Sequence, residues 1–238
     1  MPGATSPAAP IEVPRAGRWP LFGAAAALFA IGSLTFAVVT SPAERDMGDL
    51  QKILYVHVPA AWLMSVSCMI VLWYSVLYLW RRNEKHDLLA ASAAEVAATL
   101  NGLTLVLGML WARPTWGVWW TWDARLTSTL ALFLVLCGYL ALRAFVDDTE
   151  RRATWSAAVG ILGGLNAYIV YMSVRWWRTI HQLQSTPETL DSIYTFGLRL
   201  NAFAFLFLTI YFIRRRYEAA LLERATEQAV QAAALGRS

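Results

Sequence analysis

Six long apolar segments restrict the folds that this chain can adopt. They cover about residues 19–40, 58–80, 88–111, 126–146, 153–174 and 192–213. Each is close to the roughly 20 apolar residues that a helix needs to cross a hydrocarbon core of about 30 Å. Because lipid offers no hydrogen-bond partners, the backbone must satisfy its own N–H and C=O groups there, as a helix does. The pattern predicts an all-α integral membrane protein with six transmembrane helices.

Composition agrees with this class and argues against an ordinary soluble domain. Hydrophobic residues make up 58% of the chain and charged residues only 15%, whereas about a quarter of a soluble domain is charged. The net charge of +4 does not indicate nucleic-acid binding, because the basic residues gather at the ends of apolar segments. The first segment is longer than the 7–15 apolar residues typical of a cleaved signal peptide, so we expect a retained helix.

Small and ionisable residues inside the apolar segments have several interpretations. Cys68 and Cys137 are expected to be inert packing residues, since the chain has neither C-x-x-C nor C-x-x-C-H. The G-x-x-x-G at 160–164 favours close helix packing. Glu95 and Arg199 are costly inside a membrane. They can pair, although their expected depths differ, and Arg199 can either anchor its helix or serve an anionic ligand.

The distribution of Lys and Arg predicts the orientation. With alternating connections, one side holds Arg15, Arg18, Arg81, Arg82, Lys85, Arg143, Arg151, Arg152, Arg214, Arg215, Arg216, Arg224 and Arg237. The opposite side holds Arg45, Lys52, Arg113, Arg125, Arg175 and Arg178. The richer side is cytoplasmic under the positive-inside rule. Both termini are therefore expected in the cytoplasm of a bacterial inner-membrane protein.

These assignments divide the chain into three parts. Residues 1–18 are rich in Pro and Ala and are expected to form a disordered cytoplasmic leader. Residues 19–213 form the six-helix membrane domain, and 214–238 form a cytoplasmic tail whose Ala, Leu, Glu and Arg content favours a helix. The periplasmic segments, at about 41–57, 112–125 and 175–191, are longer than the cytoplasmic connections and contain the unusual residues.

The loop at about 111–128, between the third and fourth helices, reads WARPTWGVWWTWDARLTS and contains five of the twelve tryptophans. An interfacial aromatic belt places one or two indoles at a helix end, and this cluster is denser. Pro114 and Gly117 are expected to break regular structure here. A short helical turn would bring Trp116, Trp119 and Trp120 to one face. Such a platform suits a broad, flat, apolar ligand, and Asp123 with Arg125 can form an ion pair or contact polar groups of the ligand.

Two of the three histidines lie on the same expected side as this loop. His57 lies where the first outer segment meets the second helix, and His181 lies in the third outer segment. His86 is expected to be a charged surface residue on the cytoplasmic side. A pair of imidazoles can hold a haem iron from both faces. Basic residues that can meet the two haem propionates are Lys52, Arg113, Arg125, Arg175, Arg178 and Arg199.

Three motifs give the chain a family resemblance over about residues 45–215. WGVWWTWDARLTS resembles the WWD signature of haem-handling membrane proteins, and YVHVPAAW and SVRWWRTIHQ are similar to the other two outer motifs of the CcmC haem-delivery family of System I cytochrome c maturation. Lys52 and Arg175 depart from the family pattern, which often has Arg and an acidic residue there.

The resemblance implies a non-enzymatic haem-transfer protein. His57 and His181 would be axial ligands of a non-covalent haem b, and the loop residues would contact the haem edge and the periplasmic haem chaperone CcmE. Those loop residues are Trp116, Gly117, Trp119, Trp120, Trp122 and Asp123. The protein would present haem so that a histidine of CcmE can bond to a vinyl group. The implied partners are the ABC transporter subunits CcmA and CcmB and the small membrane protein CcmD.

The sequence is also compatible with two other functions. A b-type electron-transfer subunit would need histidines within facing helices, commonly with a second haem at another depth. A permease subunit that moves haem through the bilayer is compatible with Glu95 and Arg199, although two charges do not define a pathway. The chain has no Walker A motif, so ATP use would belong to a partner. No nucleophile–base pair indicates an enzyme.

Overall fold

The computed structural model describes residues 17–181 and 192–235. Most of the expected leader and the last part of the third outer segment lie outside these residues. The helices are α1 (Trp19–Thr40), the short 3-10 helix η1 (Asp49–Ile53), α2 (Leu54–Arg81), α3 (Glu84–Trp116), α4 (Ala124–Phe145), α5 (Thr149–Trp176) and α6 (Ser192–Leu235). All six α-helices are long and apolar enough to cross a membrane. The predicted all-α, six-helix fold is confirmed.

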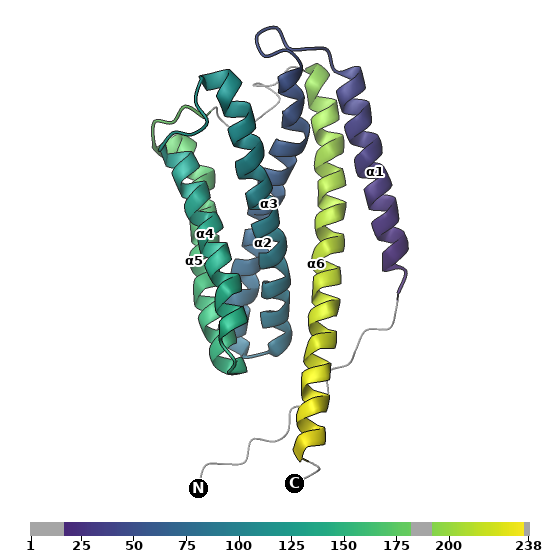
Figure 1. Ribbon diagram of the computed structural model, residues 1–238, viewed down its shortest axis with the longest axis vertical. Coiled ribbons are helices and arrows are strands. Elements are labelled where there is room, and N and C mark those ends of the chain that lie inside the picture. Colours follow the sequence, from purple (N-terminus) through teal and green to yellow (C-terminus); the bar gives the residue numbers. More distant parts are fainter. Residues whose placement is uncertain (1–16, 182–191, 236–238) are drawn as a thin grey trace.

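The helices run up and down in one bundle (Figure 1). α2 and α3 pack together in the middle, with the α4–α5 pair on one side and the α6–α1 pair on the other. α1 begins and α6 ends toward the same end of the bundle. The described parts of the three predicted outer segments meet at the opposite end, which we call the outer end after the expected topology.

Short polar residues define where several helices begin. The side chain of Asn83 accepts a hydrogen bond from the Lys85 amide at the start of α3 (2.9 Å). Asp148 accepts from the Arg151 amide at the start of α5 (2.7 Å). These bonds satisfy amides that lack a partner in the first helical turn. Asp123 caps α4 in the same way, and this third cap belongs to the candidate site described below.

Two helices, α3 and α6, extend furthest beyond their apolar segments. α3 continues to Trp116 and includes Pro114, so the expected break at this proline is wrong. Gly117 ends the helix instead, with φ 77°, a left-handed conformation that glycine adopts without strain. α6 continues without interruption from Ser192 to Leu235, 44 residues in all. Its last part therefore extends well below the other helices in Figure 1.

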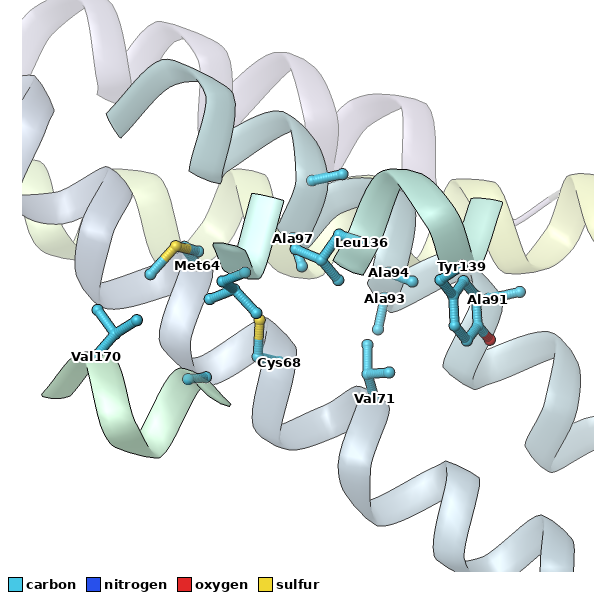
Figure 2. Packing of buried hydrophobic residues seen from close by; sticks show 13 residues of the cluster. Met64, Cys68, Val71, Ala91, Ala93, Ala94, Ala97, Leu136, Tyr139 and Val170 are labelled. Atoms are coloured by element: carbon cyan, nitrogen blue, oxygen red, sulfur yellow. The ribbon is translucent and has the colours of Figure 1, made fainter. Parts of the chain in front are cut away.

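Small side chains allow α2, α3, α4 and α5 to approach closely. Figure 2 shows Cys68 beside Met64 and Val71 of α2, facing the alanines of α3 and Leu136 of α4. Cys68 is fully buried and Cys137 is exposed, and both are free thiols. In a membrane, where lipid is as apolar as the protein, association depends on such close packing.

Ion pairs join the helices at the other end of the bundle. Arg143 of α4 contacts Asp87 of α3 with two hydrogen bonds, of 2.6 and 2.9 Å. Glu95 pairs with Arg216 of α6 (Nη2–Oε1, 2.9 Å), and Arg199 is exposed near the outer end of α6. The intramembrane pair between Glu95 and Arg199 that the sequence left open is not formed.

The glycines of α5 offer a test of this packing. A Cβ added at Gly164 would lie 2.5 Å from the Cβ of Leu72 on α2, whereas one at Gly163 would meet Val135 at an ordinary 3.5 Å. We expect Gly164→Ala to destabilise the fold by about 1–3 kcal/mol through overpacking. The matched variant Gly163→Ala should be neutral or slightly stabilising, since alanine favours a helix over glycine. Thermal unfolding of both variants in detergent measures the difference, and equal stabilities would contradict this account of the α2–α5 contact.

Candidate functional site

A cavity of about 390 Å³ lies at the outer end of the bundle. This volume falls within the roughly 300–1,000 Å³ of small-molecule pockets. Residues from all the helices except α1 line it, together with the described outer segments. They include Glu44, Met47, Gln51, His57, Thr104, Gly108, Trp111, Trp116, Trp119, Trp120, Arg125, Val170, His181 and Tyr194. The cavity thus brings together both predicted histidines and three of the predicted tryptophans, from segments far apart in sequence.

His57 lies in the first turn of α2, because this helix begins at Leu54, a few residues before its apolar run. Its imidazole lies against the backbone of α3, so that a Cβ added at Gly108 would come within 3.2 Å of Cε1. The Nδ1 atom is buried and makes no hydrogen bond to the described residues. A buried polar atom without a partner is costly in a protein alone, and the ring edge that carries Nδ1 and Cε1 faces Gly108 of α3.

His181 approaches the cavity from the segment that follows α5. Its ring lies edge-on to the indole of Trp116, with centroids 6.2 Å apart. Trp116 in turn lies edge-on to Trp111, one turn earlier on α3, with centroids 5.3 Å apart. Edge-on contacts of this kind are favourable between aromatic rings. They give His181 a fixed aromatic neighbour within the cavity wall.

The tryptophan loop does not form the helical turn that its spacing predicts. α3 ends at Trp116, and residues 117–123 are not helical. Trp119 and Trp120 nevertheless line the cavity together with Trp116. Trp122 does not line it; this indole is 77% exposed and lies edge-on to Trp120, with centroids 5.7 Å apart. Of the five indoles at about 111–128, four therefore line the cavity and one, that of Trp122, does not.

Asp123, at the end of this loop, connects two structural elements. One carboxylate oxygen accepts a hydrogen bond from the Leu126 amide (2.8 Å) and so caps α4. The other accepts from the Thr179 hydroxyl (2.6 Å) and the Ile180 amide (3.2 Å) in the segment that carries His181. The sequence suggested an ion pair with Arg125 or a contact with ligand. The structure shows these backbone and hydroxyl contacts instead.

Of the six basic residues proposed for the propionates, Arg125 is the one that lines the cavity. It is partly buried at the start of α4, and Nη1 donates to the carbonyl of Val170 on α5 (3.4 Å). The side chains of the other five make contacts elsewhere or are exposed. Lys52 pairs with Asp49, Arg113 donates to the Gly117 carbonyl, Arg175 lies over Tyr171, and Arg178 and Arg199 are exposed.

The cavity also contains polar residues that the sequence did not single out. Gln51 of η1 is 7% exposed, and its Oε1 atom is buried without a hydrogen-bond partner among the described residues. Glu44 accepts hydrogen bonds from the Met47 and Asp46 amides (2.7 and 2.8 Å), and these lower the pKa of its carboxyl. In the sequence, Gln51 could have been recognised as a polar residue one or two helical turns before a candidate histidine. No sequence pattern indicated a role for Glu44.

His86 occupies a different place from the other two histidines. It lies in the first turn of α3, at the opposite end of the bundle, beside Tyr74 of α2 (ring centroids 5.9 Å apart). It is not among the residues of the outer cavity. The expected separation of His86 from the pair formed by His57 and His181 agrees with this geometry.

Fold and cavity together define a class: a polytopic helical membrane protein with an aromatic, histidine-lined cavity at one end of its bundle. The chain belongs to the heme exporter protein C family, CcmC, whose family model matches residues 5–232.

Curated relatives agree with this assignment. The chain is similar to heme exporter protein C of Bradyrhizobium diazoefficiens, with 38% identity over 83% of this chain and 77% of the relative. Heme exporter protein C of Paracoccus denitrificans is 36% identical over 87% and 90% of the two chains. A ccmC-like mitochondrial protein of cytochrome c biosynthesis from Marchantia polymorpha is 35% identical over 76% and 78%. The resemblance expected from the three motifs is confirmed.

Proposed function

We propose that this protein binds one haem b, without a covalent bond, in the outer cavity and transfers it to the haem chaperone CcmE during c-type cytochrome maturation. His57 and His181 provide the axial imidazoles. The cavity opens on the periplasmic side of a bacterial inner membrane, with both chain termini in the cytoplasm. The ABC transporter subunits CcmA and CcmB and the small protein CcmD are the proposed partners.

One observation carries the proposal. Two histidines that are 124 positions apart line a single cavity whose walls include five indoles. Imidazole is a common axial ligand of haem iron, and flat aromatic walls suit a macrocycle. The names of the relatives, which refer to heme export and cytochrome c biosynthesis, support the same ligand.

The polar atoms of the cavity fit such a ligand. The buried Nδ1 of His57 and the indole Nε1 of Trp120 lack partners among the described residues, and Arg125 is a cation suited to one propionate. The protein needs no bond-making residue of its own for this role, because it only holds and releases its cargo. The exposed indole of Trp122 supports hand-over, since it lies outside the cavity, beside Trp120 of the wall, where a partner can contact it.

Haem titration of the purified full-length protein tests the proposal. We expect saturation at one haem per chain with a sharp Soret band, and loss of that band from the protein when a soluble form of CcmE is added. Detergent micelles without protein serve as the control for nonspecific partitioning. Binding that never saturates, or that equals the micelle control, would exclude a specific haem site.

A further inference from the structure

The two oxygens of the Asp123 carboxylate serve different segments of the chain. Oδ1 caps α4 through the Leu126 amide (2.8 Å). Oδ2 accepts from the Thr179 hydroxyl (2.6 Å) and from the Ile180 amide (3.2 Å). α4 is a long helix packed against α5, so its first turn is a fixed point of the bundle. The carboxylate therefore ties the segment after α5 to that fixed point.

Thr179 continues the connection to the candidate ligand. While its hydroxyl donates to Asp123, its oxygen accepts a hydrogen bond from the His181 amide (3.1 Å). The Asp123 carboxylate thus holds the backbone amide of Ile180, and the Thr179 hydroxyl holds the backbone amide of His181. This segment lies beyond Trp176, the last residue of α5, so helical hydrogen bonds do not fix its course.

We propose that Asp123 and Thr179 form a clamp that positions His181 as an axial ligand, which rests on the proposed haem-binding function. Asp123 and Thr179 do not contact the iron themselves; both act through the backbone of His181. Hydrogen bonds to a carboxylate are stronger than neutral ones, and a ligand must be held in a narrow range of geometry to bind a metal. Without the clamp, His57 would remain in place on α2, while the backbone at His181 would lose the hydrogen bonds that tie it to α4.

Three substitutions separate the clamp from the helix cap. Asp123→Asn keeps an oxygen for the Leu126 amide, and asparagine caps helices as well as aspartate does. With that oxygen at the cap, however, its NH2 group replaces Oδ2 and can accept a hydrogen bond from neither Thr179 nor Ile180. Thr179→Val removes the hydroxyl at nearly constant volume and leaves the cap intact. Thr179→Ser keeps the hydroxyl group. Asp148→Asn, which alters the equivalent cap of α5 at the other end of the bundle, is the matched control.

Two measurements test how these substitutions affect the position of His181. In the haem-free full-length protein, hydrogen exchange of the Ile180 and His181 amides should accelerate about tenfold in Asp123→Asn and Thr179→Val, as loss of a charge-assisted hydrogen bond implies. After haem addition, the same variants should shift from a six-coordinate low-spin to a five-coordinate high-spin spectrum, with haem affinity lowered about 10–100-fold. Free imidazole should restore the low-spin spectrum. Thr179→Ser and Asp148→Asn should match the unmodified protein.

The outcomes distinguish failure of the clamp from failure of the haem site. If exchange and spin state are unchanged in Thr179→Val, the clamp is excluded. Faster exchange with an unchanged low-spin spectrum would equally exclude it as a positioning device, since His181 would reach iron without it. If His181→Ala itself leaves the haem spectrum unaltered, the ligand assignment fails instead, whatever the exchange rates show.

Discussion

Replacing His57 or His181 with alanine is expected to convert the low-spin, six-coordinate haem spectrum of the protein into a high-spin, five-coordinate one. Each substitution removes one of the two imidazoles that we propose as axial ligands. Loss of a residue that merely orients a metal ligand commonly costs about 10–100-fold in affinity, so loss of the ligand itself should exceed that range. The double variant should retain no specific haem. Soret and visible spectra recorded during haem titration measure the coordination and the haem affinity of the two single variants and the double variant.

His86 provides the control for this experiment. It is an imidazole of the same chain, but it lies at the start of α3, away from the outer cavity. His86→Ala should therefore leave the spectrum and the haem affinity unchanged. Free imidazole should return the single variants at positions 57 and 181 toward the six-coordinate spectrum. A low-spin spectrum that persists in both of these variants would refute the ligand assignment.

Substitution of Gly108 by valine should impair haem binding nearly as strongly, although this residue carries no side chain. A Cβ at this position would already lie 3.2 Å from Cε1 of His57, and the two methyl groups of valine extend beyond it. The imidazole would have to leave its place against α3. We expect haem affinity to fall about 10–100-fold, as for loss of a ligand-orienting contact. Haem titration measures the loss.

Helix stability does not account for this expected loss. Valine favours a helix slightly more than glycine does, so the fold of α3 should persist, and circular dichroism checks this. Gly138→Val on α4 is the matched control, because a Cβ added at Gly138 meets nothing within 4 Å. Gly108→Ala should give a smaller effect than valine. Equal haem affinity in Gly108→Val and Gly138→Val would show that the α3 backbone does not hold the imidazole.

Much of the fold was predictable because it follows from local sequence. Hydrophobic length alone located the six spans. Helix ends were less certain: Pro114 is tolerated in the last turn of α3, where it removes only one helical hydrogen bond. For α1, by contrast, the expected and observed ranges coincide at residues 19–40. Residues 214–235 contain no Gly or Pro that would interrupt α6, which explains why the helix continues beyond its apolar segment.

The site was only partly predictable, because side-chain directions depend on how each helix is rotated in the bundle. Charge and position made six basic residues equivalent candidates for the propionates, and the fold directs Arg125 alone of these toward the cavity. An aspartate directly before a helix is a recognised cap signal, so that role of Asp123 was readable. Its contact with Thr179 spans 56 positions and depends on the α4–α5 arrangement, which no local pattern records.

The wide separation of the cavity residues has a consequence for the biosynthesis of the protein. The lining runs from Glu44 to Tyr194 along the chain, and a nascent membrane protein emerges from its N-terminus. His57 is made with the second span, whereas His181 follows the fifth and Tyr194 belongs to the sixth. A chain that has inserted fewer than five spans therefore offers at most one of the two imidazoles. In the proposed function, both axial ligands are present only after His181 has been made, so we expect shorter chains to bind haem much more weakly than finished ones.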